Sequence, residues 1–207
     1  EWTAALTRWC DGQPDLVPYA GQCLVHRSEI SQLHGDWARA LDEATRACDR
    51  LAGRPAIANA YYQLAEMQRL RGEFTEAEQA YRRVGELGRQ PQPGLALLWL
   101  AEHRVNVAAS AIARVLDESS DRPSRCRVLP AYVDIMLAAQ QVSAAQIAAD
   151  ELFTIAETLG APFLRATAAD ARGAGLLAQG DPAGALIQLR RALAIWRQLE
   201  APYESAR

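Results

Sequence analysis

A short motif recurs along the chain. It consists of a turn glycine, an acidic residue, a large packing residue, and an alanine five positions after the glycine. It occurs at Gly35-Asp36-Trp37, Gly72-Glu73-Phe74 and Gly180-Asp181-Pro182, and weaker copies begin at His103 and Gln140. The five turn positions, 35, 72, 103, 140 and 180, are therefore separated by 37, 31, 37 and 40 residues. This spacing is typical of repeated helical hairpins.

Apolar residues after each turn follow the period of an α-helix. The alanine is followed by further apolar or small residues four and seven positions later, which places all three on one helix face. These positions hold Ala40, Ala44 and Ala47; Ala77, Tyr81 and Val84; Ala108, Ile112 and Val115; Ala145, Ala149 and Leu152; and Ala185, Leu189 and Ala192. We predict that this stripe is buried on the second helix of each hairpin.

Prolines mark the starts of the first helices, where a fixed φ and a missing N–H cost least. They are Pro18, Pro55, Pro93, Pro123, Pro162 and Pro202. We predict first helices at about 16–34, 55–71, 93–103, 123–139 and 162–179. The predicted second helices lie at about 36–52, 74–88, 105–118, 142–159 and 182–199.

The pattern predicts one repeat domain over residues 1–207, with hairpins at 16–52, 55–88, 93–118, 123–159 and 162–199. Residues 1–11 resemble the second helix of a repeat, since Glu1-Trp2-Thr3 overlays on Asp36-Trp37-Ala38. Residues 202–207 resemble the start of a first helix. We therefore expect the chain to be a fragment of a longer repeat array.

At these positions the chain resembles the tetratricopeptide repeat family. The second repeat matches best, with Leu64, Ala65, Gly72, Phe74, Ala77 and Tyr81 in place, although Gln68 stands where an aromatic residue is usual. The first repeat has Ser28, Gly35, Trp37, Ala40 and Ala47, and the fifth has Gly173, Gly180, Ala185 and Ala192. The resemblance implies an all-α fold, a right-handed superhelical solenoid of stacked antiparallel helical hairpins.

A narrower resemblance involves the run GRPAIANAYYQLAE at residues 53–66, together with residues 71–74 and 91–98. These segments are similar to the repeat region of LuxR-type bacterial transcriptional regulators, whose large members are MalT-like. The resemblance implies a sensing or partner-binding region that precedes a C-terminal helix-turn-helix and can follow an ATPase module. DNA would then be bound by a segment outside these 207 residues.

Composition excludes several kinds of chemistry. All 22 basic residues are Arg, which excludes a Schiff-base lysine and the lysine-containing phosphate loop. A net charge of −3 without basic clusters argues against nucleic-acid binding by this part of the chain. No run of 18 apolar residues and no signal peptide occur, so we expect a soluble, cytoplasmic protein that does not bind membranes.

Neither the cysteines nor the histidines have the spacing of a metal site. We expect Cys10, Cys23, Cys48 and Cys126 to be buried thiols. His26 and Glu29 are one helical turn apart, close to His34, and could form a small site, although a solvated or capping role is favoured. We expect no metal, no cofactor and no enzymatic activity.

The resemblance to tetratricopeptide hairpins also indicates where a ligand would bind. First helices line the concave face, and their outward positions here include Glu29, Tyr62, Glu66, Arg69, Asp134 and Asp170. This mixture of polar and aromatic residues fits a peptide, a protein partner or a small effector, or else forms a merely solvated surface. In the third repeat Leu97 and Leu100, near Trp99, either contact a partner or the continuing superhelix, or are buried against the short hairpin, which is favoured.

Two alternatives to the sensing region remain open. The chain could be a repeat scaffold or dimerisation array that pairs with a second copy of itself. It could also be the regulatory repeat domain of a multidomain enzyme whose catalytic domain lies elsewhere.

Overall fold

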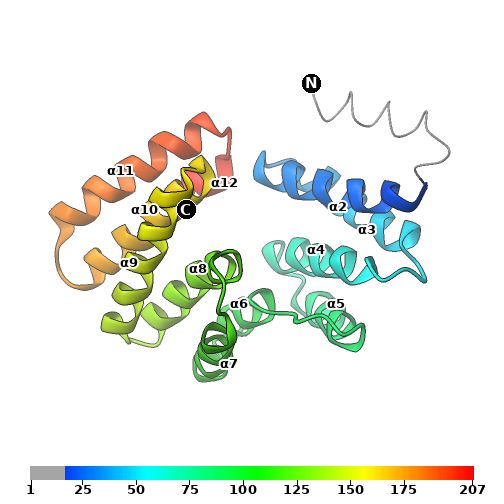
Figure 1. Cartoon of the computed structure of the whole chain (residues 1–207), viewed down its shortest axis with the longest axis horizontal. Coiled ribbons are helices and arrows are strands. Elements are labelled where there is room, and N and C mark those ends of the chain that lie inside the picture. Colours follow the sequence, from blue (N-terminus) through cyan, green and yellow to red (C-terminus); the bar gives the residue numbers. More distant parts are fainter. Residues whose placement is uncertain (1–16) are drawn as a thin grey trace. The chain divides into compact units, whose positions relative to one another are not determined.

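The computed structural model describes residues 17–207, with side chains described from residue 20 onward, and this part of the chain is all-α (Figure 1). The predicted helix at 1–11, and Cys10 with it, lie outside the described residues. The described helices are α2 Val17–Leu33, α3 Trp37–Arg50, α4 Ile57–Leu70, α5 Phe74–Glu86, α6 Gly94–Ala101, α7 Val105–Glu118, α8 Arg122–Ala138, α9 Val142–Leu159, α10 Pro162–Ala178, α11 Pro182–Gln198 and α12 Pro202–Ala206. From α2 to α11, each helix begins and ends within two residues of its predicted range.

The turn inside each hairpin has the backbone conformation that the motif requires. Gly35, Gly72 and Gly180 have φ values of 78°, 80° and 81°, and the non-glycine residues His103 and Gln140 have φ values of 61° and 59°. All five predicted turn positions therefore lie in the left-handed region, where glycine is least strained. The repeat register derived from sequence is correct even in the two copies that lack glycine.

The acidic residue after the turn caps the next helix in two of the three glycine-containing copies. The Asp36 carboxylate accepts a hydrogen bond from Arg39 N at 3.2 Å, and Asp181 accepts one from Gly184 N at 2.9 Å. These bonds satisfy backbone donors that the first turn of a helix leaves open. Glu73 makes no such bond before α5.

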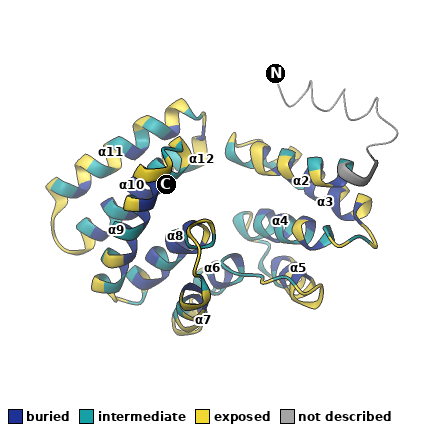
Figure 2. Ribbon diagram, viewed as in Figure 1, coloured by how far each residue is buried: buried dark blue, intermediate teal, exposed yellow. Residues whose placement is uncertain are grey.

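The predicted stripe on the second helices is buried, with one exception. Fourteen of its fifteen positions are buried, and five of them are the alanines at 40, 77, 108, 145 and 185. Leu189 of α11 is 37% exposed. Figure 2 shows the burial along each helix, with the most exposed residues of α11 on one side.

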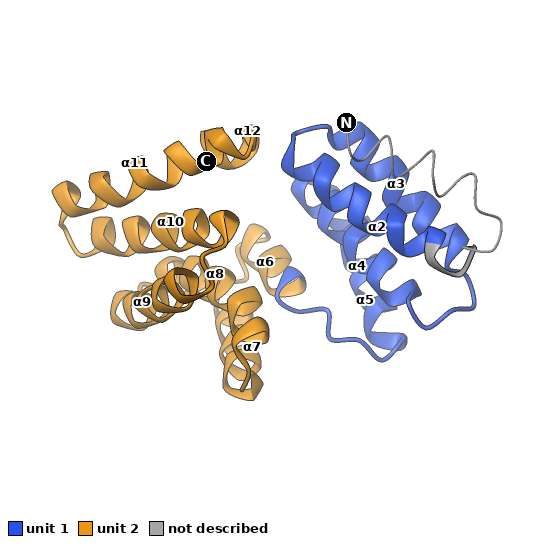
Figure 3. Cartoon of the chain, turned by 45° about the horizontal axis from the view of Figure 1, so that its top comes forward, with its two compact units in different colours: residues 1–94 blue, residues 95–207 orange. Residues whose placement is uncertain are grey.

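The chain divides into two compact units, residues 1–94 and residues 95–207 (Figure 3). In unit 1, α2 packs against α3, α4 packs against both, and α5 packs against α4. Its core includes Leu24, Val25, Ala47, Leu51 and Ala60. Consecutive helices thus pack as adjacent pairs, which is consistent with a helical repeat.

In unit 2, each helix from α7 to α11 packs against the next one, and α8 also packs against α10. The core is a continuous apolar cluster that includes Ile112, Leu129, Val133 and Leu152. Leu97, Trp99 and Leu100 of α6 are partly buried against this cluster. Of the two alternatives for α6, packing within the unit is therefore correct.

Among the helices that the structure describes, none combines the length and the apolar character that crossing a bilayer requires.

Candidate functional site

The six candidate residues fall into two units and are considered unit by unit. In unit 1, Tyr62, Glu66 and Arg69 of α4 lie together, and Tyr81 of α5 joins them. Glu29 of α2 is exposed and contacts His26 instead, with Nδ1 of His26 3.0 Å from Oε2 of Glu29. Three of the four candidate residues in unit 1 therefore lie in one cluster.

We call Tyr62, Glu66, Arg69 and Tyr81 the Glu66 cluster. Arg69 Nη2 donates to Glu66 Oε2 at 2.7 Å, and Tyr81 Oη donates to Glu66 Oε1. The rings of Tyr62 and Tyr81 pack edge to face, with centroids 5.8 Å apart. Both oxygens of the carboxylate are thus engaged within the protein.

The segment before α6 closes over the Glu66 cluster. Gly94 N donates to Tyr62 Oη at 3.1 Å, and the Arg89 guanidinium lies 4.3 Å from the centre of the Tyr62 ring. A Cβ at residue 94 would overlap Glu66 Oε1 and Tyr81 Oη, so a larger residue here would have to displace these two side chains. The cluster therefore anchors the end of unit 1 and leaves little room for a ligand.

Electrostatics support this structural role. Burial, reinforced by the Glu66 charge, raises the pKa of Tyr81 far above its ordinary value of 10, so the phenol remains a hydrogen-bond donor. Burial opposes the charge of Arg69, but Glu66 and Tyr81 outweigh it and raise the pKa of Arg69. Neither group is poised to exchange a proton near neutral pH.

In unit 2, Asp134 of α8 and Asp170 of α10 come together with two residues that the sequence analysis did not select. Arg207 donates from Nη2 to Asp134 Oδ2, and Trp196 Nε1 donates to Asp170 Oδ2 at 2.6 Å. We call Asp134, Asp170, Trp196 and Arg207 the Asp170 cluster. Trp196 is also in edge-to-face contact with Phe163, with centroids 5.2 Å apart.

Burial raises the pKa of Asp170 above its ordinary value of 3.8, and the neighbouring Asp134 charge adds to this effect. The Trp196 N–H and the Arg207 charge act in the opposite direction. Asp134, in turn, raises the pKa of Arg207. The Asp170 cluster is therefore an acidic site that is partly neutralised by one guanidinium.

The repeat spacing did not select Arg207. The step from Pro162 to Pro202 is 40 residues, so the position equivalent to Asp170 lies 40 residues further on, whereas Arg207 lies 37 residues further on. Trp196 gave no signal either, because it belongs to a second helix and reaches Asp170 from the side of the hairpin.

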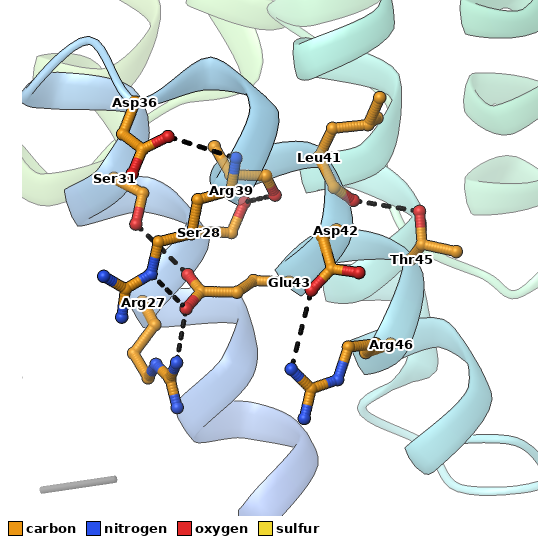
Figure 4. Close-up of polar contacts among 11 residues, drawn as sticks. Arg27, Ser28, Ser31, Asp36, Arg39, Leu41, Asp42, Glu43, Thr45 and Arg46 are labelled. Atoms are coloured by element: carbon orange, nitrogen blue, oxygen red, sulfur yellow. Dashed lines mark hydrogen bonds and ion pairs between the residues drawn. The ribbon is translucent and has the colours of Figure 1, made fainter. Parts of the chain in front are cut away.

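A third polar cluster, in unit 1, was missed from sequence. Glu43 of α3 is 1% exposed and accepts hydrogen bonds from Arg27 Nη2 at 2.5 Å, Arg39 Nε at 3.0 Å and Ser31 Oγ at 3.2 Å. Figure 4 shows these side chains converging on the carboxylate from α2 and α3. Glu43 stands three residues after Ala40, next to the predicted buried stripe, and this position was the available signal.

We call Arg27, Ser31, Arg39 and Glu43 the Glu43 cluster. Both carboxylate oxygens of Glu43 accept hydrogen bonds within the protein, whereas the buried Nε of Arg27 has no hydrogen-bond partner. Next to the Glu43 cluster, Ser28 Oγ donates to the Ala40 carbonyl at 2.7 Å, and Gln63 Nε2 donates to Gln32 Oε1 at 2.8 Å. These bonds connect α2 with α3 and with α4. The arrangement holds helices together and does not present reactive groups.

Within residues 17–207, no group of three or more His, Cys, Asp or Glu side chains is arranged to hold a metal ion. Cys48 and Cys126 are buried free thiols, as predicted, whereas Cys23 is only partly buried. Burial is the main reason that the pKa of Cys48 is raised to about 12, and the Asp49 charge adds to it.

Comparison with known proteins identifies no family for this chain. No protein-family model matches the chain, and no curated protein or solved structure is significantly similar to it.

Proposed function

We propose that this chain is a non-enzymatic sensing or partner-binding region of a LuxR-type bacterial transcriptional regulator that works in the cytoplasm. In this proposal the tetratricopeptide-like hairpins stack into a right-handed solenoid whose first helices bind an effector or a protein. A DNA-binding domain outside these residues receives the signal. The repeat pattern, the correct turn positions and the packing of consecutive helices support the proposal.

The Asp170 cluster is the observation that carries the proposal. Helices α8 and α10 are the first helices of neighbouring hairpins, and each contributes one carboxylate to a site that already holds a guanidinium. Charge-assisted hydrogen bonds between carboxylates and guanidinium groups are among the stronger polar contacts in proteins. A cationic ligand with an apolar part would match the two carboxylates and the nearby, partly exposed Phe163 ring.

Such a ligand would act by bridging two helices. A response requires that the ligand bind one arrangement of the hairpins more tightly than another. Because Asp134 and Asp170 come from different hairpins, a cation that contacts both favours the spacing of α8 and α10 at which both contacts form. The signal would then be a change in the packing of successive hairpins.

The test is a thermal-shift screen of the purified chain with guanidino compounds, amines and arginine-containing peptides. At least one of these compounds should raise the melting temperature, because a ligand stabilises the state that binds it. The double variant Asp134→Asn with Asp170→Asn should lose the response, whereas Asp117→Asn, at an exposed position of α7, should keep it. If no cation stabilises the chain, or if the double variant responds like the parent, the site is wrong.

The regulatory part of the proposal needs the parent protein. In a transcriptional reporter strain, the same double variant should abolish the response to the stabilising compound while the protein level stays unchanged. An undiminished response would show that the Asp170 cluster does not control transcription.

A further inference from the structure

The Asp170 cluster contains a guanidinium of its own. Arg207 donates from Nη2 to Asp134 Oδ2, although 73 residues of sequence separate the two. The Asp134 side chain is still 32% exposed with Arg207 against it, so the carboxylate is not enclosed by this contact. The ion pair connects α8 with the segment that follows α11.

The second carboxylate of the cluster is held in place from within the protein. Asp170 Oδ2 accepts a hydrogen bond from Nε1 of Trp196, whose side chain is buried. Arg207 lies close enough to lower the pKa of Asp170 while Asp134 raises it, so one guanidinium partly offsets two carboxylates. Glu204 of α12 adds a further negative charge near Arg207.

This arrangement suits a guanidinium better than an ammonium group. A guanidinium carries five N–H donors in one plane and can pair with carboxylates from two helices at the same time. It is also more weakly hydrated than an ammonium group, so it loses less when it enters a partly buried site. Arg207 shows that the group fits beside Asp134.

We propose that Arg207 is an internal competitor for the ligand of the Asp170 cluster, and that this ligand carries a guanidinium group rather than an ammonium group. The inference rests on the proposed function, since it names the group that the two carboxylates bind. The incoming guanidinium displaces Arg207 from Asp134 and pairs with Asp134 and Asp170. Binding thus exchanges one ion pair for another and breaks the connection between α8 and Arg207.

Three matched probes test the chemical class of the ligand. They are the amides of benzoylarginine, benzoyllysine and benzoylcitrulline, which share an aromatic ring and end in a guanidinium, an ammonium and a neutral urea group. Isothermal titration calorimetry with the purified chain should show binding of the arginine compound and at least about tenfold weaker binding of the lysine compound. The citrulline compound should not bind measurably, because it has no charge.

A variant without the competitor tests the role of Arg207. Arg207→Gln should bind the arginine compound at least about threefold more tightly than the parent, since no ion pair has to be broken, and partly exposed ion pairs contribute effects of this size. The matched control Arg114→Gln makes the same change of charge at an exposed position of α7 in the same unit. Its affinity should equal that of the parent within about 1.5-fold.

A double-mutant cycle separates displacement from repulsion at a distance. In the parent, Asp134→Asn removes a ligand contact but also removes the partner that holds the competitor, so the two effects partly cancel. In the Arg207→Gln background only the ligand contact is lost. Asp134→Asn should therefore weaken binding more in Arg207→Gln than in the parent, whereas simple charge repulsion predicts the same weakening in both.

Three results would overturn the inference. They are equal binding of the arginine and lysine compounds, unchanged affinity in Arg207→Gln, and an equal effect of Asp134→Asn in the two backgrounds. If a cation binds through Asp134 and Asp170 but any of these results is found, the internal competitor is wrong and the proposed site stands. If no cation binds the chain, the proposed site and the competitor both fail.

Discussion

The helices of the two units are held together by different kinds of contact. Among the described residues, the buried polar or charged side chains are Ser28, Ser31, Glu43 and Gln63, and all four belong to unit 1. The core of unit 2 is instead one continuous cluster of apolar residues. The packing of unit 1 thus depends on specific hydrogen bonds between buried side chains. The packing of unit 2 depends on how well apolar side chains fill its core.

This difference predicts different responses to substitution. A buried carboxylate contributes little net stability when it is paired, yet removing one member of the pair leaves an uncompensated charge and is costly. An apolar core loses stability in proportion to the cavity that a substitution creates, and it tolerates changes that conserve volume. Unit 1 should therefore lose most stability when a buried polar side chain is replaced by an apolar one. Unit 2 should lose most stability when a buried side chain becomes smaller.

The largest effect is expected at Glu43. The substitution Glu43→Ala leaves the largely buried guanidinium of Arg27 without its carboxylate and should lower the free energy of unfolding by about 3–5 kcal/mol. Chemical denaturation followed by circular dichroism measures this change. The exposed Glu76→Ala of α5 is the control and should change stability by less than about 0.5 kcal/mol.

Cysteine labelling shows which unit is affected by Glu43→Ala. Cys48 of unit 1 and Cys126 of unit 2 are buried, and burial raises the pKa of both thiols, so each reacts when its surroundings open. Glu43→Ala should accelerate alkylation at Cys48 more than at Cys126. An unchanged rate at Cys48 would contradict the idea that the Glu43 cluster holds unit 1 together.

In unit 2 the strongest effect should come from loss of volume. Leu152 of α9 is fully buried, so Leu152→Ala should cost about 3 kcal/mol, and Leu152→Met, which nearly conserves volume, should cost less than about 1.5 kcal/mol. The same denaturation experiment measures both. If the methionine variant were as unstable as the alanine variant, the stability of unit 2 would not depend mainly on the volume of its core side chains.

These contrasts also show how far sequence could predict the fold. Periodicity located the helices and all five hairpin turns, because an amphipathic helix and a left-handed turn are properties of short segments. It also located the buried stripe except at Leu189, since burial there depends on what covers α11. Local pattern was sufficient for features that a single helix or turn determines.

The candidate sites were predicted less completely. Choosing outward positions on the first helices found Asp134 and Asp170, but it selected Glu66 and Arg69 without showing that Tyr81 and Gly94 close over them. Glu43 was missed because its partner Arg27 lies 16 residues away on the preceding helix. Whether a polar residue is available to a ligand depends on such contacts, which periodicity does not contain.

A smaller effect is expected from the titration of Asp170. Its pKa in the folded protein lies above the ordinary value of 3.8, so the stability that its protonated form contributes is complete below pH 3.8 and is lost as the pH rises through the raised pKa. Asp170→Asn keeps a side-chain oxygen that can accept the Trp196 hydrogen bond, and it removes the loss of stability with rising pH. Relative to the parent, the variant should therefore gain stability as the pH rises above 3.8 and through the raised pKa of Asp170, by less than the change in Leu152→Ala.

Glu151 of the same unit is the internal contrast for this measurement. Its hydrogen bond with Arg125 lowers its pKa, so its contribution to stability is present above its ordinary value of 4.5 and is lost as the pH falls through the lowered pKa. Glu151→Gln should therefore change the pH dependence of unfolding in the direction opposite to Asp170→Asn. Parallel shifts in the two variants would show that the surroundings of Asp170 do not penalise its charge.

The smallest effect should come from the hairpin turns, where the units differ again. Both hairpin turns of unit 1 use glycine, at Gly35 and Gly72. Unit 2 uses glycine at Gly180 but has His103 and Gln140 in the left-handed conformation at its other two hairpin turns. That conformation costs an L-residue about 1–2 kcal/mol, and glycine gives back about 0.5–1 kcal/mol because it is more flexible in the unfolded chain. His103→Gly and Gln140→Gly should each stabilise the protein by about 0.5 kcal/mol.

The reverse substitution completes this test. Gly72→Ala has open space for its Cβ, so its cost should reflect backbone strain alone, about 1 kcal/mol. Thermal unfolding of the three variants measures both directions on one scale. If His103→Gly and Gln140→Gly destabilised the chain, the His103 and Gln140 side chains would stabilise the fold by more than the backbone strain costs. These two turns of unit 2 would then depend on side-chain contacts, whereas the glycine turns depend on the backbone alone.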